Sequence, residues 1–173
     1  MGDGKIIALV RDMETKDVEK ASKVLCSVLL ETWERYEKDV YPRRALDFDI
    51  SVNTPEKLTE KLSDPQGFFF VAEEDEAIVG VAYGNIVGES GLATLDWIGV
   101  LPKYQHRGIG KALMQKVIKH CAEKGCHKII LYTLPVDVPA INLYLKSGFV
   151  PEAYFHKEWW KVDIIKMSLW LET

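Results

Sequence analysis

The sequence lacks a surplus of basic residues. Its 173 residues include 22 lysines and arginines against 26 aspartates and glutamates, which gives a formal net charge of -4. A protein that holds nucleic acid by its phosphates usually carries a basic surplus, so the charge balance argues against a nucleic-acid partner. An acidic balance mildly favours a cationic partner such as an amine.

Long apolar runs and targeting signals are also missing. The longest apolar stretch, residues 24–30, contains Ser27 and is far too short to span a bilayer. The apolar segment at residues 5–10 is too short for the core of a signal peptide, and Arg11 follows it. We therefore predict neither a membrane partner nor export.

Cysteine is scarce, and its spacing suggests neither disulfides nor a metal. Cys26, Cys121 and Cys126 are odd in number and fit no disulfide framework, which is typical of a reducing, cytoplasmic compartment. Histidines flank two of them, but the shorter spacing of zinc-binding pairs is absent. Cys121 also falls on the apolar face of a predicted helix, where a free cysteine packs as a small hydrophobe. We expect no metal site.

Apolar residues are plentiful. They make up 47% of the sequence, enough for one hydrophobic core, so we predict a single domain over residues 1–173. Periodicity and turn residues predict helices at 15–38, 54–64, 110–124 and 139–146. They predict strands at 5–10, 67–72, 78–87, 92–100, 128–133, 149–155 and 162–171. Two neighbouring turns make the second to fourth strands an antiparallel meander. The order predicts an α+β fold with a central mixed, mostly antiparallel twisted sheet flanked by helices.

Residues 100–112 carry the chemistry. A strand ends there, a loop with two glycines follows, and an amphipathic helix begins. The first N–H groups of a helix have no internal partner and lie at the positive end of its dipole. Gly108 and Gly110 let an anion approach, so these N–H groups can hold a pyrophosphate, with Arg107 and Lys111 adding charge. The alternative is a glycine loop that only caps a core helix.

The ligand of this loop can be narrowed by elimination. A dinucleotide-binding loop needs a glycine where Leu113 stands. A nucleotide P-loop needs a glycine at Gln105 and a serine or threonine at Ala112, so both motifs fail. The remaining pattern, Gln105-x-x-Gly108-x-Gly110, resembles the pyrophosphate loop of the GNAT acetyltransferase superfamily.

Two further segments support this resemblance, which covers about residues 68–171. The late helix carries Tyr144 four residues before a Gly-Phe pair, as in the family, with Asn142 at a commonly polar position. Residues 94–100 are similar to the strand whose backbone pairs with the pantetheine arm. Asp137 departs from the pattern, because many members have an asparagine there.

The resemblance implies that acetyl-CoA binds and that an amine attacks its thioester directly. Backbone N–H groups at residues 98–100 would polarise the carbonyl. The residues that the resemblance assigns to the cofactor are Ile98, Gly99, Val100, Gln105, His106, Arg107, Gly108, Ile109, Gly110, Lys111, Ala112, Asp137, Asn142 and Tyr144.

The catalytic pair is assigned on the same basis. Tyr144 would donate to the departing sulfur, because its hydroxyl is protonated at neutral pH. Some relatives have a carboxylate on this strand at the position of Thr94, which cannot act as a base. Asp96 lies on the same face of the strand and would accept the amine proton through a water. The alternatives are a tyrosine that only packs and an aspartate that is solvent-facing or ion-paired.

The acceptor stays open between a small amine, a polyamine and a peptide, as does the choice between monomer and homodimer. The aromatic segments 33–36 and 158–160 either line an acceptor cleft or simply pack. A sensor that binds acyl-CoA without turnover is the main alternative, because Thr94 is no base. A protein-interaction domain with a purely structural glycine loop is a third reading.

Overall fold

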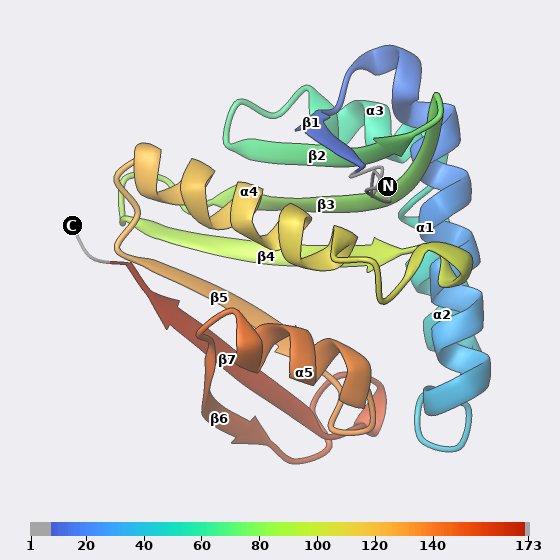
Figure 1. Cartoon of the computed structure of the whole chain (residues 1–173). Coiled ribbons are helices and arrows are strands. Elements are labelled where there is room, and N and C mark those ends of the chain that lie inside the picture. Colours follow the sequence, from blue (N-terminus) through green and yellow to red (C-terminus); the bar gives the residue numbers. More distant parts are fainter. Residues whose placement is uncertain (1–7, 172–173) are drawn as a thin grey trace, which may run out of the picture.

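A computed structural model describes residues 8–171 of the chain. One seven-stranded sheet, in the order β1-β2-β3-β4-β5-β7-β6, organises it (Figure 1). Every neighbouring pair is antiparallel except β4 and β5, so the sheet is mixed as predicted. Residues 5–7 of the first predicted strand lie outside the described residues. The strands are β1 (Leu9–Asp12), β2 (Gly67–Glu74), β3 (Ala77–Ile86), β4 (Leu92–Val100), β5 (Lys128–Thr133), β6 (Val150–Phe155) and β7 (Ile164–Trp170).

Helices cover both faces of the sheet. Phe68 and Phe70 of β2 pack in one buried cluster with Leu113, whereas the alternate residues Phe69 and Val71 pack in a second cluster with α1 and α3. Side chains alternate between the faces of a strand, so the two helix groups lie on opposite faces. None of the helices within residues 8–171 is long and apolar enough to cross a membrane. The helices are α1 (Val18–Thr32), α2 (Arg43–Ser51), α3 (Pro55–Leu62), α4 (Ile109–Glu123) and α5 (Val138–Lys146).

The N-terminal helical region differs from the prediction. The helix expected at 15–38 is divided into a short 3-10 turn, α1 and a π-helical turn at Trp33–Glu37. The indole Nε1–H of Trp33 donates to the carbonyl oxygen of Tyr41 at 2.7 Å and so ties this wider turn to the segment that follows. The sequence pattern also missed α2, because only Ala45 and Leu46 of that helix are buried.

The core gives the first testable prediction. Leu113 of α4 is fully buried against the sheet. We expect Leu113→Ala to lower the free energy of unfolding by about 2–5 kcal/mol, because a cavity replaces the lost contacts. Urea denaturation measures this, with Lys119→Ala on the exposed side of α4 as the control. A loss below about 1 kcal/mol would contradict this packing.

The parallel pair β4 and β5 separates partway along. It is paired only over Leu92–Thr94 and Lys128–Ile130, and the two strands then move apart toward α1 and α2 (Figure 1). Beyond that point β4 stays with β3, and β5 stays with β7. Within residues 8–171, therefore, no strand pairs with the β5-facing edge of the last half of β4.

A β-bulge accompanies this separation. Tyr83 is opposite Trp97 and Gly84 is opposite Leu95, so Asp96 is the extra residue on β4. A bulge bends its strand and re-aims the side chain at that position. Gly84 makes the close approach possible, because a Cβ there would lie only 2.0 Å from the carbonyl oxygen of Thr94.

Candidate active site

The start of α4 presents free backbone donors. Gly108 precedes the helix with a φ of +87°, a left-handed conformation that favours glycine, and a Cβ added there would meet nothing within 4 Å. Ala112 N–H donates to the carbonyl oxygen of Gly108 at 3.0 Å. The N–H groups of Ile109, Gly110 and Lys111 precede this bond and have no partner within the helix. This arrangement suits an anion.

The side chains of the loop have different roles. Gln105 donates from Nε2 to the carbonyl oxygen of Val100 at 2.9 Å and closes the loop. Ile109 is buried in the core, so only its backbone faces the anion position. His106 and Lys111 are exposed. Arg107 pairs with Glu74 of β2 at 2.8 Å, so its charge is largely balanced, and its place beside a phosphate stays a prediction.

The middle of α5 lies next to the first turn of α4. A Cβ added to Gly110 would be 3.5 Å from Cδ2 of Leu143 on α5. Asp137 caps α5 by accepting from the N–H of Ala140 at 3.4 Å. Asp137 and Gln105 both line a small hollow of about 50 Å³. Two predicted cofactor residues from distant segments therefore meet here, whereas Asn142 is exposed further along α5.

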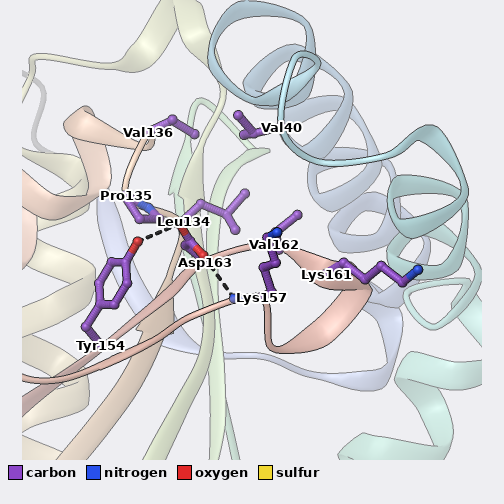
Figure 2. Close-up of a pocket in the computed structure, with 9 residues that line it drawn as sticks. All are labelled: Val40, Leu134, Pro135, Val136, Tyr154, Lys157, Lys161, Val162 and Asp163. Carbon is purple, nitrogen blue, oxygen red and sulfur yellow. Dashed lines mark hydrogen bonds between the residues drawn. The ribbon is translucent and has the colours of Figure 1, made fainter.

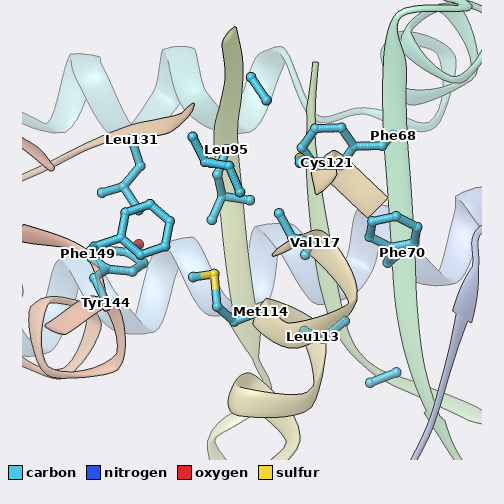
Figure 3. Packing of buried hydrophobic residues seen from close by; sticks show 14 of the residues in the cluster. Phe68, Phe70, Leu95, Leu113, Met114, Val117, Cys121, Leu131, Tyr144 and Phe149 are labelled. Carbon is cyan, nitrogen blue, oxygen red and sulfur yellow. The ribbon is translucent and has the colours of Figure 1, made fainter. Parts of the chain in front are cut away.

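Tyr144 lies under α5 at the edge of the main core. The side chain is 8% exposed and packs against Phe149, with the ring centroids 6.1 Å apart. Figure 3 shows the pair beside Leu131 of β5, with Leu95 of β4 and Met114 across from them. Within residues 8–171 the Tyr144 hydroxyl forms no hydrogen bond. Burial, reinforced by the charge of Asp137, raises the pKa of Tyr144, so the hydroxyl remains a proton donor at neutral pH.

Asp96 lies on the opposite face of the sheet. Thr94 donates from Oγ1 to its carboxylate at 2.8 Å, so the two side chains share a face as predicted. Solvent reaches Asp96, yet partial desolvation raises its pKa, while the Thr94 hydrogen bond and the charge of Lys61 oppose this shift. Lys61 belongs to α3, which places Asp96 on the side that α1–α3 cover. The proposed acid and base thus flank the separated strands from opposite faces.

Sequence reasoning missed a second group of carboxylates. Glu37 lies in the π-helical turn and is half-buried. Burial raises the pKa of Glu37 to about 7, reinforced by the negative charges of Asp137 and Asp49. Asp49 of α2 accepts a hydrogen bond from the Tyr41 hydroxyl at 2.8 Å. These groups come from three separate segments, so no spacing in the sequence could have joined them.

A larger open pocket of about 320 Å³ adjoins this group (Figure 2). Its walls come from the connection after α1, the connection after β5 and the β6–β7 loop. The Tyr154 hydroxyl and the Lys157 N–H donate to Asp163 at 2.5 and 2.9 Å. Lys161 is the other charged residue of the lining, which consists of Val40, Leu134, Pro135, Val136, Tyr154, Lys157, Lys161, Val162 and Asp163.

Known proteins resemble the chain in sequence and in fold. The family model described as acetyltransferase (GNAT) family matches residues 25–149. A mycothiol acetyltransferase of Arthrobacter sp. (strain FB24) is 32% identical over 97 residues, which are 54% of this chain but only 30% of that protein. The chain therefore spans less than a third of the length of that relative.

Two solved structures share the fold. PaiA N-acetyltransferase from Thermoplasma acidophilum, solved in complex with coenzyme A, superposes with a TM-score of 0.75 at 22% identity and covers 91% of this chain and 96% of its own. Ribosomal-protein-S18-alanine N-acetyltransferase from Escherichia coli superposes with a TM-score of 0.72 at 19% identity, covering 96% of each chain. At these identities the likeness concerns the fold.

Proposed function

The chain belongs to the acetyltransferase (GNAT) family, and we propose that it transfers an acetyl group from acetyl-CoA to a primary amine by direct attack. The observation that carries the proposal is the gap between β4 and β5, which opens beside the free N–H groups at the start of α4. A pyrophosphate would bind at that helix start, and the pantetheine arm would pair with the free edge of β4. PaiA, a protein of the same fold, was solved in complex with coenzyme A, which supports acetyl-CoA as the ligand.

The two faces of the sheet then have different chemical roles. The amine approaches from the side of α1–α3, and its nitrogen forms a bond with the thioester carbon. The carbon–sulfur bond breaks, and the thiolate leaves on the side of α4 and α5, where Tyr144 can donate a proton. The backbone of β4 from Ile98 to Val100 would polarise the carbonyl oxygen. Attack from one face and departure on the other need no acyl-enzyme.

Two carboxylates on the acceptor side are candidates to take the amine proton. Asp96 follows from the sequence resemblance, and Glu37 is favoured by the structure. A general base works best when its pKa is near the working pH, and the pKa of Glu37 is about 7. Glu37 accepts a proton only when ionised, so activity that depends on it is lost as the pH falls through this value.

The pH profile of kcat/KM distinguishes them. We expect wild type to lose about tenfold per pH unit below pH 7, and Glu37→Gln to lower activity and remove this limb. Deprotonation of the amine substrate adds a second pH dependence, near pH 8 for a peptide N-terminus. This second dependence shifts when a different amine is used. Asp96→Asn should keep the Glu37 limb. If Asp96→Asn instead removes it and Glu37→Gln leaves it, Asp96 is the base.

Thiol release tests the activity itself. We expect free coenzyme A to appear from acetyl-CoA only when a primary amine is added, in step with N-acetylated product. A protein that binds acetyl-CoA but turns over no small amine, polyamine or peptide would instead be a sensor. The missing carboxylate at Thr94 is what favours that second reading.

We also propose that the protein works in a reducing, cytoplasmic compartment. The support is limited to its cysteines. Cys26, Cys121 and Cys126 are all free thiols, and the last two are buried in the main core. A disulfide framework, which is common in exported proteins, is not formed by these three residues.

A further inference from the structure

The cleft on the acceptor side carries opposite charges at its two ends. Glu37, Asp49 and Asp137 form the acidic end: Glu37 is close enough to the other two for their charges to act on it, and Asp137 directly follows Val136 of the outer pocket. Lys157 and Lys161 line the outer pocket, and within residues 8–171 neither forms a salt bridge.

The carboxylate in the outer pocket does not cancel these two lysines. Asp163 accepts hydrogen bonds from the Tyr154 hydroxyl, the Lys157 N–H and Nδ1 of His156. These donors hold the pKa of Asp163 below its usual range, so it stays ionised and internally satisfied. The two lysines against one aspartate leave the lining with a net charge of +1.

An apolar floor joins the two ends. Leu134 and Val162 are buried in a small cluster, against which Tyr41 and Val136 pack. Tyr41 donates its hydroxyl to Asp49, and Val136 is followed directly by Asp137. The apolar floor of the outer pocket thus leads to Asp49 and Asp137, and the cluster that forms it contributes no other polar side chain between them.

The β6–β7 loop is fixed in place. Lys157, Trp160 and Lys161 have φ values of 49°, 59° and 62°, in the left-handed region that non-glycine residues rarely adopt. Trp160 packs against Phe48 of α2 with the ring centroids 5.8 Å apart, and the guanidinium of Arg44 is 5.6 Å from the same ring. Strain of this kind persists where contacts impose it and is common at ligand-binding sites. The loop therefore presents both lysines from a supported position.

We propose that the acceptor is a peptide N-terminus with an apolar first residue and acidic side chains in the next two or three positions. This inference rests on the proposed acetyl transfer. The terminal amine lies at the carboxylates of the acidic end, the apolar side chain contacts the floor, and the acidic side chains reach Lys157 and Lys161. A polyamine fits less well, because its second ammonium would approach the two lysines and be repelled. The exposed Trp159, at 53%, extends the apolar surface beyond the pocket and suits a chain longer than a small amine.

Matched peptides test this assignment. We would measure kcat/KM for peptides of equal length that begin with alanine and continue directly with two glutamates, two serines or two lysines, together with spermidine and free alanine. We expect the acidic peptide to exceed the basic one by about tenfold at low ionic strength, and the ratio to shrink as salt is added. The double variant Lys157→Glu with Lys161→Glu should reverse the order. Lys119→Glu, an equal charge change per site on the far end of α4, should leave it unchanged.

The outcomes separate the two proposals. Equal use of acidic and basic peptides, or spermidine or alanine as the best substrate, overturns the peptide assignment but leaves acetyl transfer in place. An unchanged order in the double variant, with its fold confirmed by circular dichroism, also overturns it. Acetyl-CoA binding without turnover of any of these amines overturns the proposed transfer itself.

Discussion

Tyr144→Phe should lower kcat by about 10²–10⁴-fold, the usual contribution of a general acid. The variant keeps the ring that packs against Phe149 and removes only a hydroxyl that forms no hydrogen bond within the described residues. Charge develops on sulfur mainly as the thioester breaks, so the loss belongs to the transition state rather than to cofactor binding. We would measure kcat by single-turnover thiol release and acetyl-CoA affinity by calorimetry.

Tyr132→Phe is the control for this substitution. Tyr132 is an exposed tyrosine on β5, and the same change there should leave kcat within experimental error. Acetyl-CoA affinity should change little in either variant. A loss below about threefold for Tyr144→Phe corresponds to under about 1 kcal/mol of barrier and would mean that another group protonates the thiolate.

Gly108→Val should weaken acetyl-CoA binding by at least about tenfold, or roughly 1.4 kcal/mol. Gly108 directly precedes the free N–H groups of α4, where the pyrophosphate is proposed to bind, and an added Cβ would occupy space that no protein atom fills within 4 Å. The backbone at Gly108 is left-handed, so the substitution also strains the fold by about 1 kcal/mol. A titration calorimeter measures the affinity.

Gly125 provides a matched control at the other end of α4. It has a φ of +76°, and an added Cβ there also meets nothing within 4 Å. Gly125→Val therefore imposes a similar backbone strain without approaching the proposed pyrophosphate position. Equal affinity losses in the two variants would show that strain, rather than an occupied anion site, explains the effect at Gly108.

Local patterns predicted the elements around the glycine loop well. The glycine loop, the helix that follows it and the late helix with Tyr144 are each defined by residues close together in the sequence. The strand meander and the mixed, mostly antiparallel sheet also followed from the turns and the element order. The shared face of Thr94 and Asp96 was predicted, because side chains two apart on a strand point the same way, but the hydrogen bond between them was not.

The proposed acceptor side was not predicted, because it depends on contacts between distant segments. On the regular helix that the sequence predicts, Glu37 would be an ordinary surface residue. In the structure it lies in a π-helical turn, is half-buried and is close to Asp49 of α2. The pairing of Arg107 with Glu74 joins residues 33 positions apart, so the sequence could not show that this charge is balanced. The two lysines in the lining of the outer pocket, Lys157 and Lys161, likewise could not be inferred from the net charge of the whole chain.

Release of coenzyme A from acetyl-CoA, followed with and without a primary amine and coupled to mass analysis of the amine, measures the proposed reaction itself. We predict no thiol release by the wild-type protein alone, and one N-acetyl group formed for each thiol released once an acceptor is present. Wild-type protein that binds acetyl-CoA yet releases thiol no faster with any amine would contradict the account. Thiol release at the same rate with and without amine would contradict it equally, since the acetyl group would then be passing to water.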